Sequence, residues 1–255
     1  MEKKEQKIQV NGLNINYKII GEGKPFLILH GWGSKSDRWT EVADILSQKG
    51  FKVVIPDLPG FGKSDGPKNA WNLDNYVEFV EKFAEIIGLD KFILAGHSFS
   101  GAISIKYAIK NPGDIEKLFL LAPACLRRDS FRKKAFRIIS KLFKVYSFIP
   151  GYKLARKAFY KFIIRKSDYQ YTNGTMKETY LKIISEDLSG ILNEVKADTI
   201  IIWGDEDDIV PIGQGKEINR KISGSKLIII PGADHKLEIK TPEALASKIL
   251  ENIVG

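Results

Sequence analysis

The hexapeptide Gly96-His97-Ser98-Phe99-Ser100-Gly101 constrains the fold of this chain more than any other stretch. The apolar run Lys91–Ala95 precedes it, and the largely apolar run Ala102–Ala108 follows it. This order predicts a strand that enters a helix through a tight turn with Ser98 at its apex. Small residues, Gly96 and Ser100, stand two positions before and after the serine, because a bulky side chain there would collide across so sharp a turn. Such a turn lifts the Ser98 hydroxyl clear of a sheet and directs the first N–H groups of the helix toward its target.

The hexapeptide departs at one position from Gly-x-Ser-x-Gly, the usual pattern of a nucleophile elbow. Ser100 stands where the second glycine is usual, and Gly101 follows it. Because serine is nearly as small as glycine, we expect the turn to form. Short Gly/Ser motifs also occur by chance in strand–helix connections. The partners available to Ser98 must therefore decide between the two interpretations.

The strands expected from the sequence are rich in β-branched residues and are bounded by Gly, Pro, Asn or Asp. Asn11-Gly12 predicts a hairpin between the first two strands. Several later runs are apolar on both faces, which is typical of parallel strands covered by helices on both sides. The sequence thus predicts an α/β fold, a mostly parallel sheet of about eight strands flanked by helices. The expected strands are Lys7–Val10, Leu13–Ile19, Pro25–His30, Lys52–Pro56, Lys91–Ala95, Lys117–Leu121, Thr199–Trp203 and Lys226–Ile230.

Helical periodicity is clearest over Asn75–Ile87, and a closing helix is predicted from Pro242 to Ile253 with Thr241 at its N-cap. Between Leu121 and Thr199 the strand–helix alternation stops, and amphipathic helical segments take its place. One of these is expected to start at Thr175, whose spacing to Glu178 fits a capping box. We interpret residues 125–189 as a helical cap inserted into a core formed by residues 1–124 and 190–255.

Basic residues are concentrated in the predicted cap. From Leu126 to Lys166 there are fourteen Lys and Arg residues and one acid, Asp129, so the rest of the chain carries a net charge of −4. Such a segment is more often a solvated face than a recognition site. If it does bind a partner, an anionic substrate or an anionic membrane surface fits its charge. We expect no nucleic acid, because no known nucleic-acid-reading motif accompanies the charge.

A serine is a weak nucleophile without a base within hydrogen-bond reach. The chain has three histidines. His97 adjoins Ser98, so its side chain is expected to project elsewhere, and His30 is better placed to shape the loop after its strand. His235 follows the last predicted strand, at the sheet edge where Ser98 is expected. By elimination His235 is the candidate base.

A histidine base needs a carboxylate to hold its tautomer and stabilise the imidazolium. The loop after the strand Thr199–Trp203 contains four acids, Asp205, Glu206, Asp207 and Asp208, and any of them could serve. Asp234 is a weaker candidate because neighbouring side chains rarely point at each other. An acid in this loop gives the order Ser, Asp, His along the chain.

An oxyanion formed by attack on a carbonyl group needs two N–H donors. One is expected from the residue after the nucleophile, Phe99. The other is expected from the loop after the strand Pro25–His30, where Gly31 and Gly33 allow close backbone approach. In that loop Trp32 is placed to donate its backbone N–H.

Together these segments resemble the α/β-hydrolase superfamily, in family order from about residue 25 to the C-terminus. His30-Gly31-Trp32-Gly33 resembles the family's oxyanion loop, and Asp57-Leu58-Pro59-Gly60-Phe61-Gly62-Lys63-Ser64 resembles its turn after the next strand. Trp203-Gly204-x-x-Asp207-x-x-x-Pro211 resembles its acid loop, which singles out Asp207 among the four acids. Gly232-x-x-His235 resembles its histidine loop.

The resemblance implies acyl transfer to water by Ser98, His235 and Asp207, with no metal or organic cofactor. A carboxylic ester is the substrate we expect. Carbon–carbon bond hydrolysis, thioester or amide cleavage, and acylglycerol or lysophospholipid lipase activity are alternatives on the same triad. A serine at the elbow disfavours epoxide hydrolases and haloalkane dehalogenases, which use an aspartate there. A non-catalytic member that binds a ligand or a membrane is a further, weaker alternative.

Composition and targeting signals indicate where such a chain would act. The charged first residues, 1–7, cannot serve as a secretory signal, and no apolar run approaches the length that spans a bilayer. The single cysteine, Cys125, excludes an internal disulfide and a cysteine-rich metal site. We therefore expect a cytoplasmic protein.

Overall fold

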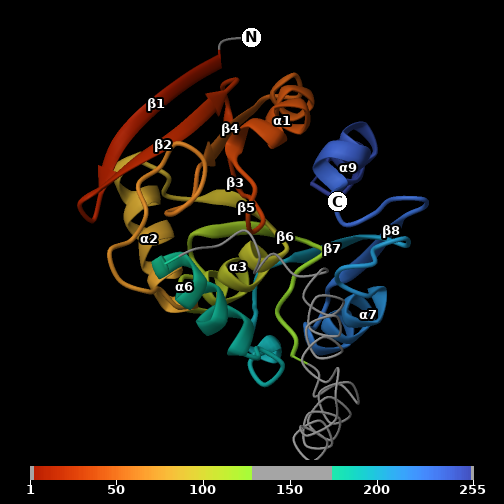
Figure 1. Cartoon of the computed structure of the whole chain (residues 1–255). Helices are drawn as coiled ribbons and strands as arrows, with labels where there is room; N and C mark the ends of the chain where they lie inside the picture. Colours follow the sequence, from red (N-terminus) through yellow and green to blue (C-terminus); the bar gives the residue numbers. More distant parts are fainter. Residues whose placement is uncertain (1–2, 128–173, 254–255) are drawn as a thin grey trace, which may run out of the picture.

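The computed structural model describes residues 3–127 and 174–253. Eight strands form one sheet in the order β1-β2-β4-β3-β5-β6-β7-β8 (Figure 1). β1 and β2 pair antiparallel, as do β2 and β4, and every other neighbouring pair is parallel. The predicted mostly parallel, eight-stranded α/β sheet is confirmed. The strands are β1 (Lys3–Val10), β2 (Leu13–Ile20), β3 (Lys24–Leu29), β4 (Phe51–Pro56), β5 (Phe92–His97), β6 (Ile115–Leu121), β7 (Thr199–Gly204) and β8 (Lys226–Ile230).

Helices cover both faces of the sheet, which explains the doubly apolar strands. On one face, α2 (Leu73–Ile86), α3 (Phe99–Lys110) and α7 (Ile212–Lys221) bury side chains against one set of strand residues. On the other face, α1 (Thr40–Ser47) and α9 (Pro242–Glu251) pack on the alternate residues of the same strands (Figure 1). The remaining elements are η1 (Ser36–Trp39), α6 (Gly174–Ser185), η3 (Leu192–Glu194) and α8 (Leu237–Lys240).

The predicted elements are found with small changes at their ends. β1 begins four residues earlier than expected, because Lys3–Lys7 continue the ladder with β2 despite their exposure. Asn11 and Gly12 both have positive φ, 50° and 77°, as the predicted hairpin turn requires. α2 begins at Leu73 and not at Asn75, because Asn72 is its N-cap and forms a reciprocal capping box with Asn75.

Thr241 is the N-cap residue of α9, as predicted, although its hydroxyl donates to the carbonyl of Leu237 in the preceding helix α8 and does not cap α9. The helix start predicted at Thr175 is wrong. α6 begins at Gly174, so Thr175 lies inside the helix and not at its start. Most of the predicted cap, including its basic segment and the amphipathic helices expected there, lies outside the described residues.

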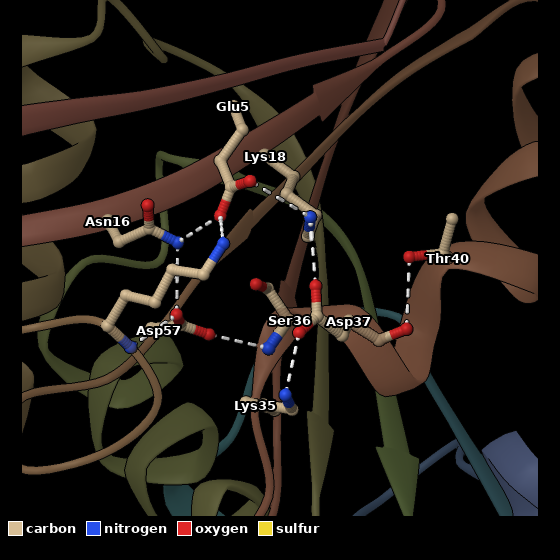
Figure 2. A network of polar contacts seen from close by, with 9 residues as sticks. Glu5, Asn16, Lys18, Lys35, Ser36, Asp37, Thr40 and Asp57 are labelled. Carbon is tan, nitrogen blue, oxygen red and sulfur yellow. Dashed lines mark hydrogen bonds and ion pairs between the residues drawn. The ribbon is translucent and has the colours of Figure 1, made fainter.

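A network of polar contacts fastens the turn after β4 to the start of η1 (Figure 2). The buried carboxylate of Asp57 accepts hydrogen bonds from the backbone N–H of Ser36 (2.6 Å), the Asn16 side chain (3.0 Å) and the backbone N–H of Lys63 (2.9 Å). Glu5 accepts from the same Asn16 amide, which carries the network to the edge strand β1. Because Ser36 closely follows the loop after β3, this network fixes where that loop runs.

Candidate active site

The parallel strands end at one edge of the sheet, and the loops that leave β3, β5, β7 and β8 meet there. Ser98 follows β5, with φ 55° and ψ −119°, a left-handed conformation that is strained for a residue with a side chain. Neighbouring glycines make this tight turn feasible. A Cβ on Gly96 would lie 2.2 Å from Ser104 Oγ, and one on Gly101 would lie 2.4 Å from Pro123 Cβ. The elbow geometry expected from the hexapeptide is therefore present.

The structure brings Ser98, His235 and Asp207 together in one hydrogen-bonded chain. Nε2 of His235 lies 3.0 Å from Oγ of Ser98, and Nδ1 of the same ring lies 2.7 Å from Oδ2 of Asp207. The Asp207 side chain is fully buried, while Ser98 is half-buried. A carboxylate can only accept, so Nδ1 of His235 carries the proton and Nε2 presents its lone pair to the Ser98 hydroxyl.

The acid loop holds Asp207 by its second oxygen. Oδ1 accepts hydrogen bonds from the backbone N–H groups of Ile209 (2.9 Å) and Val210 (2.8 Å). Asp205 instead accepts from the backbone N–H of Gly232 (2.7 Å) and so joins the acid loop to the histidine loop. Of the carboxylates in this loop, Asp207 is the one buried against His235.

Trp32 and Phe99, the expected oxyanion donors, lie side by side next to Ser98. Their rings meet edge to face at 5.4 Å, and both residues line a cavity with Ser98. Phe99 is the first residue of α3, so its backbone N–H has no acceptor within the helix. The backbone of Gly31 passes so close to His97 that a Cβ there would lie 2.8 Å from Nδ1 of that ring.

His97 contributes more to the site than the sequence predicted. Its side chain does not bond Ser98, as expected, but it lies against His235, with ring centroids 4.9 Å apart. Nε2 of His97 donates to the backbone carbonyl of His235 at 2.9 Å. Burial lowers the pKa of His97 and so keeps the ring neutral. His97 thus fixes the backbone of the candidate base, a role that its position beside the serine did not reveal.

His30 shapes the loop after β3, as its position predicted. Nδ1 donates to the carbonyl of Gly31 (2.8 Å), and Nε2 accepts from the backbone N–H of Leu58 (3.0 Å). Burial is the main cause that lowers the pKa of His30 to about 4. The neutral ring therefore joins the candidate oxyanion loop to the turn after β4.

Two cavities meet at Ser98. The larger, of about 540 Å³, is lined by His235 and by the charged residues Arg38, Lys236 and Glu238. The smaller, of about 200 Å³, has mostly apolar walls and is lined by Phe99 and by side chains of α6. Ser98 thus has room on two sides, as an enzyme that splits its substrate into two parts requires.

In residues 3–127 and 174–253, no helix has both the length and the apolarity to cross a membrane. In the same ranges, His, Cys, Asp and Glu side chains form no group of three that could hold a metal ion.

Comparisons with known proteins match the chain to hydrolases. Residues 24–146 match the family model described as the alpha/beta hydrolase fold. The AB hydrolase superfamily protein YisY of Bacillus subtilis is 29% identical, and the match covers 91% of this chain and 92% of that protein. The 2-hydroxy-6-oxo-6-phenylhexa-2,4-dienoate hydrolase of Comamonas testosteroni is 26% identical over 87% of this chain and 84% of the relative. The crystal structure of CarC, a serine hydrolase involved in carbazole degradation, superposes with a TM-score of 0.77 at 21% identity, and the match covers 99% of each chain.

Proposed function

Because residues 24–146 match the alpha/beta hydrolase family model and relatives such as YisY align over most of the chain, we propose that this protein is a serine hydrolase of the α/β-hydrolase superfamily that cleaves carboxylic esters through an acyl-enzyme intermediate. The observation that carries the proposal is the hydrogen-bonded chain from Ser98 through His235 to Asp207. The proposed substrate is a small acyl compound.

In this mechanism Ser98 attacks the ester carbonyl as Nε2 of His235 takes the proton from its hydroxyl. Asp207 holds the His235 ring in the reactive tautomer and stabilises the imidazolium that forms. The backbone N–H groups of Trp32 and Phe99 donate to the oxyanion. His235 then passes its proton to the leaving alcohol. Water attacks the acyl-enzyme in the same way, with His235 as the base, and the acid is released.

Carbon–carbon bond hydrolysis is the second candidate, because the Comamonas relative is named a dienoate hydrolase. The same serine, base and oxyanion donors would serve either reaction, so their geometry favours neither. Thioesters, amides and acylglycerols are further substrates that this triad could cleave. A purely binding role is disfavoured by the short Ser98–His235 and His235–Asp207 contacts.

A panel of p-nitrophenyl esters from acetate to palmitate tests the proposal. We expect hydrolysis by the wild type and a loss of roughly 10⁴- to 10⁶-fold in Ser98→Ala. The matched control is Ser247→Ala, which changes an exposed serine on α9 and should retain full activity. Equal activity in wild type and Ser98→Ala would reject the mechanism. Hydrolysis of 2-hydroxy-6-oxo-6-phenylhexa-2,4-dienoate without any ester hydrolysis would select the second candidate.

A further inference from the structure

The two cavities at Ser98 differ in chemistry, and only one of them is lined by the candidate base. His235 lines the larger cavity and is absent from the lining of the smaller one. The histidine must reach the leaving oxygen to protonate it. The leaving alcohol therefore belongs in the larger cavity, and the acyl group belongs in the smaller one.

Most of the smaller cavity is apolar, but Arg127 and Gln214 line it as well as Ser98 and Tyr180. Within the described part of the chain, Nε of Arg127 and Oε1 of Gln214 are buried and have no hydrogen-bond partner. Buried polar atoms without a partner are costly, and each one calls for an explanation. Both atoms border the space that the acyl group would fill.

Among the described residues, one side-chain hydrogen bond positions Arg127. Nη2 donates to the carbonyl of Ile183 at 3.2 Å, which positions the guanidinium beside α6. The neighbouring carboxylates are used elsewhere: Asp187 accepts from the backbone N–H groups of Arg127 and Ser189, and Glu186 pairs with Lys106. Burial lowers the pKa of Arg127, although a guanidinium keeps its charge at neutral pH. Asp187 and Glu186 act on the guanidinium from nearby, but Nε of Arg127 has no hydrogen-bond partner in the described residues and can donate to a carboxylate of a ligand.

Gln214 stands at the N-terminal part of α7 and is held there by its backbone N–H, which donates to the carbonyl of Pro211 at 2.8 Å. Its side-chain amide can present either its oxygen or its N–H donors, depending on how the group is turned. Next to an arginine, an amide that turns its N–H groups inward completes a site for a carboxylate.

We propose that the smaller cavity is an acyl subsite for a short acyl group that ends in a carboxylate, held by Arg127 and Gln214. This inference rests on the proposed function, because it assumes that Ser98 acylates. A cavity of about 200 Å³ has the room of roughly seven water molecules at ~30 Å³ each, so a short acyl group such as succinyl fits it. The bond from Ser98 Oγ to the acyl carbon forms as the ester C–O bond breaks, and water later releases the dicarboxylic acid.

A matched pair of methyl esters tests the subsite. Monomethyl succinate carries the terminal carboxylate, and methyl 4-methylpentanoate places an isopropyl group of similar shape in the same position. We expect the wild type to have the higher kcat/KM on monomethyl succinate, measured by proton release at constant pH. Arg127→Met should lower the ratio of the two kcat/KM values by ~10- to 100-fold, the loss of one charge-assisted hydrogen bond. Arg127→Lys should recover part of the ratio because it keeps the charge.

Arg220→Met is the matched control, because it removes an exposed arginine from α7 outside both cavities and should leave the ratio unchanged. Gln214→Glu supplies a second, independent variant. It places a negative charge beside the expected carboxylate, where it also competes for the Arg127 guanidinium, and should lower the ratio without replacing Arg127. A wild-type preference for the neutral ester, or a ratio that Arg127→Met and Gln214→Glu both leave unchanged, would overturn the subsite.

Binding separates this proposal from the failure of ester hydrolysis. Monomethyl succinate titrated calorimetrically into Ser98→Ala should bind, and it should bind at least tenfold more weakly when Arg127→Met is added. That loss without any turnover in the wild type would reject the ester reaction and retain the subsite. Turnover of methyl 4-methylpentanoate with no Arg127-dependent binding of monomethyl succinate would reject the subsite and retain the ester reaction.

Discussion

The hydroxyl of Ser100 donates a hydrogen bond of 2.5 Å to the backbone carbonyl of His30. Ser100 is fully buried in the first turn of α3, and His30 ends the segment that leads into the candidate oxyanion loop. This bond therefore joins the two loops that supply the oxyanion donors Phe99 and Trp32. The serine that departs from the usual elbow pattern fills the place of a glycine and ties the elbow to the neighbouring strand.

Replacing Ser100 should affect stability more than chemistry. Ser100→Gly restores the usual pattern but removes the bond to His30 and adds a glycine to a helix, so we expect a stability loss of about 1–3 kcal/mol. Ser100→Ala removes only the hydroxyl and should lose less. Both variants should keep ester hydrolysis within about tenfold of wild type, because no catalytic side chain changes. Urea unfolding and kcat/KM measure the two effects, and complete inactivation of Ser100→Ala would assign the hydroxyl a direct role in the reaction.

The acid loop offers a comparison among neighbouring carboxylates. Asp207→Asn leaves the shape intact but presents an amide to Nδ1 of His235, so the wrong tautomer is favoured and kcat should fall by roughly 10³- to 10⁴-fold. Asp208→Asn changes an exposed side chain and should retain activity. Asp205→Asn removes the carboxylate that accepts from Gly232 and should cost less than tenfold. Steady-state kinetics on one p-nitrophenyl ester compare the three variants. A larger loss of kcat in Asp205→Asn or Asp208→Asn than in Asp207→Asn would assign the catalytic acid to that residue.

The succession of strands along the chain and the loops that carry the candidate site could be predicted from the sequence. Each loop follows an apolar strand, and the carboxyl ends of parallel strands meet at one edge of a sheet. The side-chain contacts around Ser98 could not be predicted in the same way. The contacts of His97 with His235 and of Ser100 with His30 join residues far apart in the chain, and no local pattern signals them. Arg127 was counted among the charges of a basic segment, where nothing distinguishes a buried arginine from exposed ones.

Asp57 should matter for stability more than an exposed carboxylate of the same turn. Asp57→Ala removes the buried acceptor of the backbone N–H groups of Ser36 and Lys63, so we expect the free energy of unfolding to fall by on the order of 3 kcal/mol. Asp65→Ala is the control, because Asp65 is exposed and water can replace its bonds to Asn14. Guanidinium unfolding of the two variants measures the difference. Equal losses would show that the network in Figure 2 adds nothing beyond surface bonds.

The buried ring of His30 should make the protein less stable in mild acid. Its Nδ1 donates to Gly31, and its Nε2 accepts from the backbone N–H of Leu58. Protonation of Nε2 therefore removes the acceptor for Leu58 and places a charge in a buried site. The unfolded chain binds this proton near pH 6.5, whereas in the folded protein the pKa of His30 is about 4.

Between these two pKa values the unfolded state binds more protons, so stability falls as the pH drops from 6.5 to 4 and levels off below that range. The difference in pKa corresponds to about 3 kcal/mol at most. His97, whose pKa is also lowered by burial, adds a loss of the same sign. Urea unfolding at pH 7.5, 6, 5 and 4 should show this decline in the wild type and a shallower one in His30→Gln. Identical slopes in the two proteins would show that His30 is protonated equally in the folded and unfolded states.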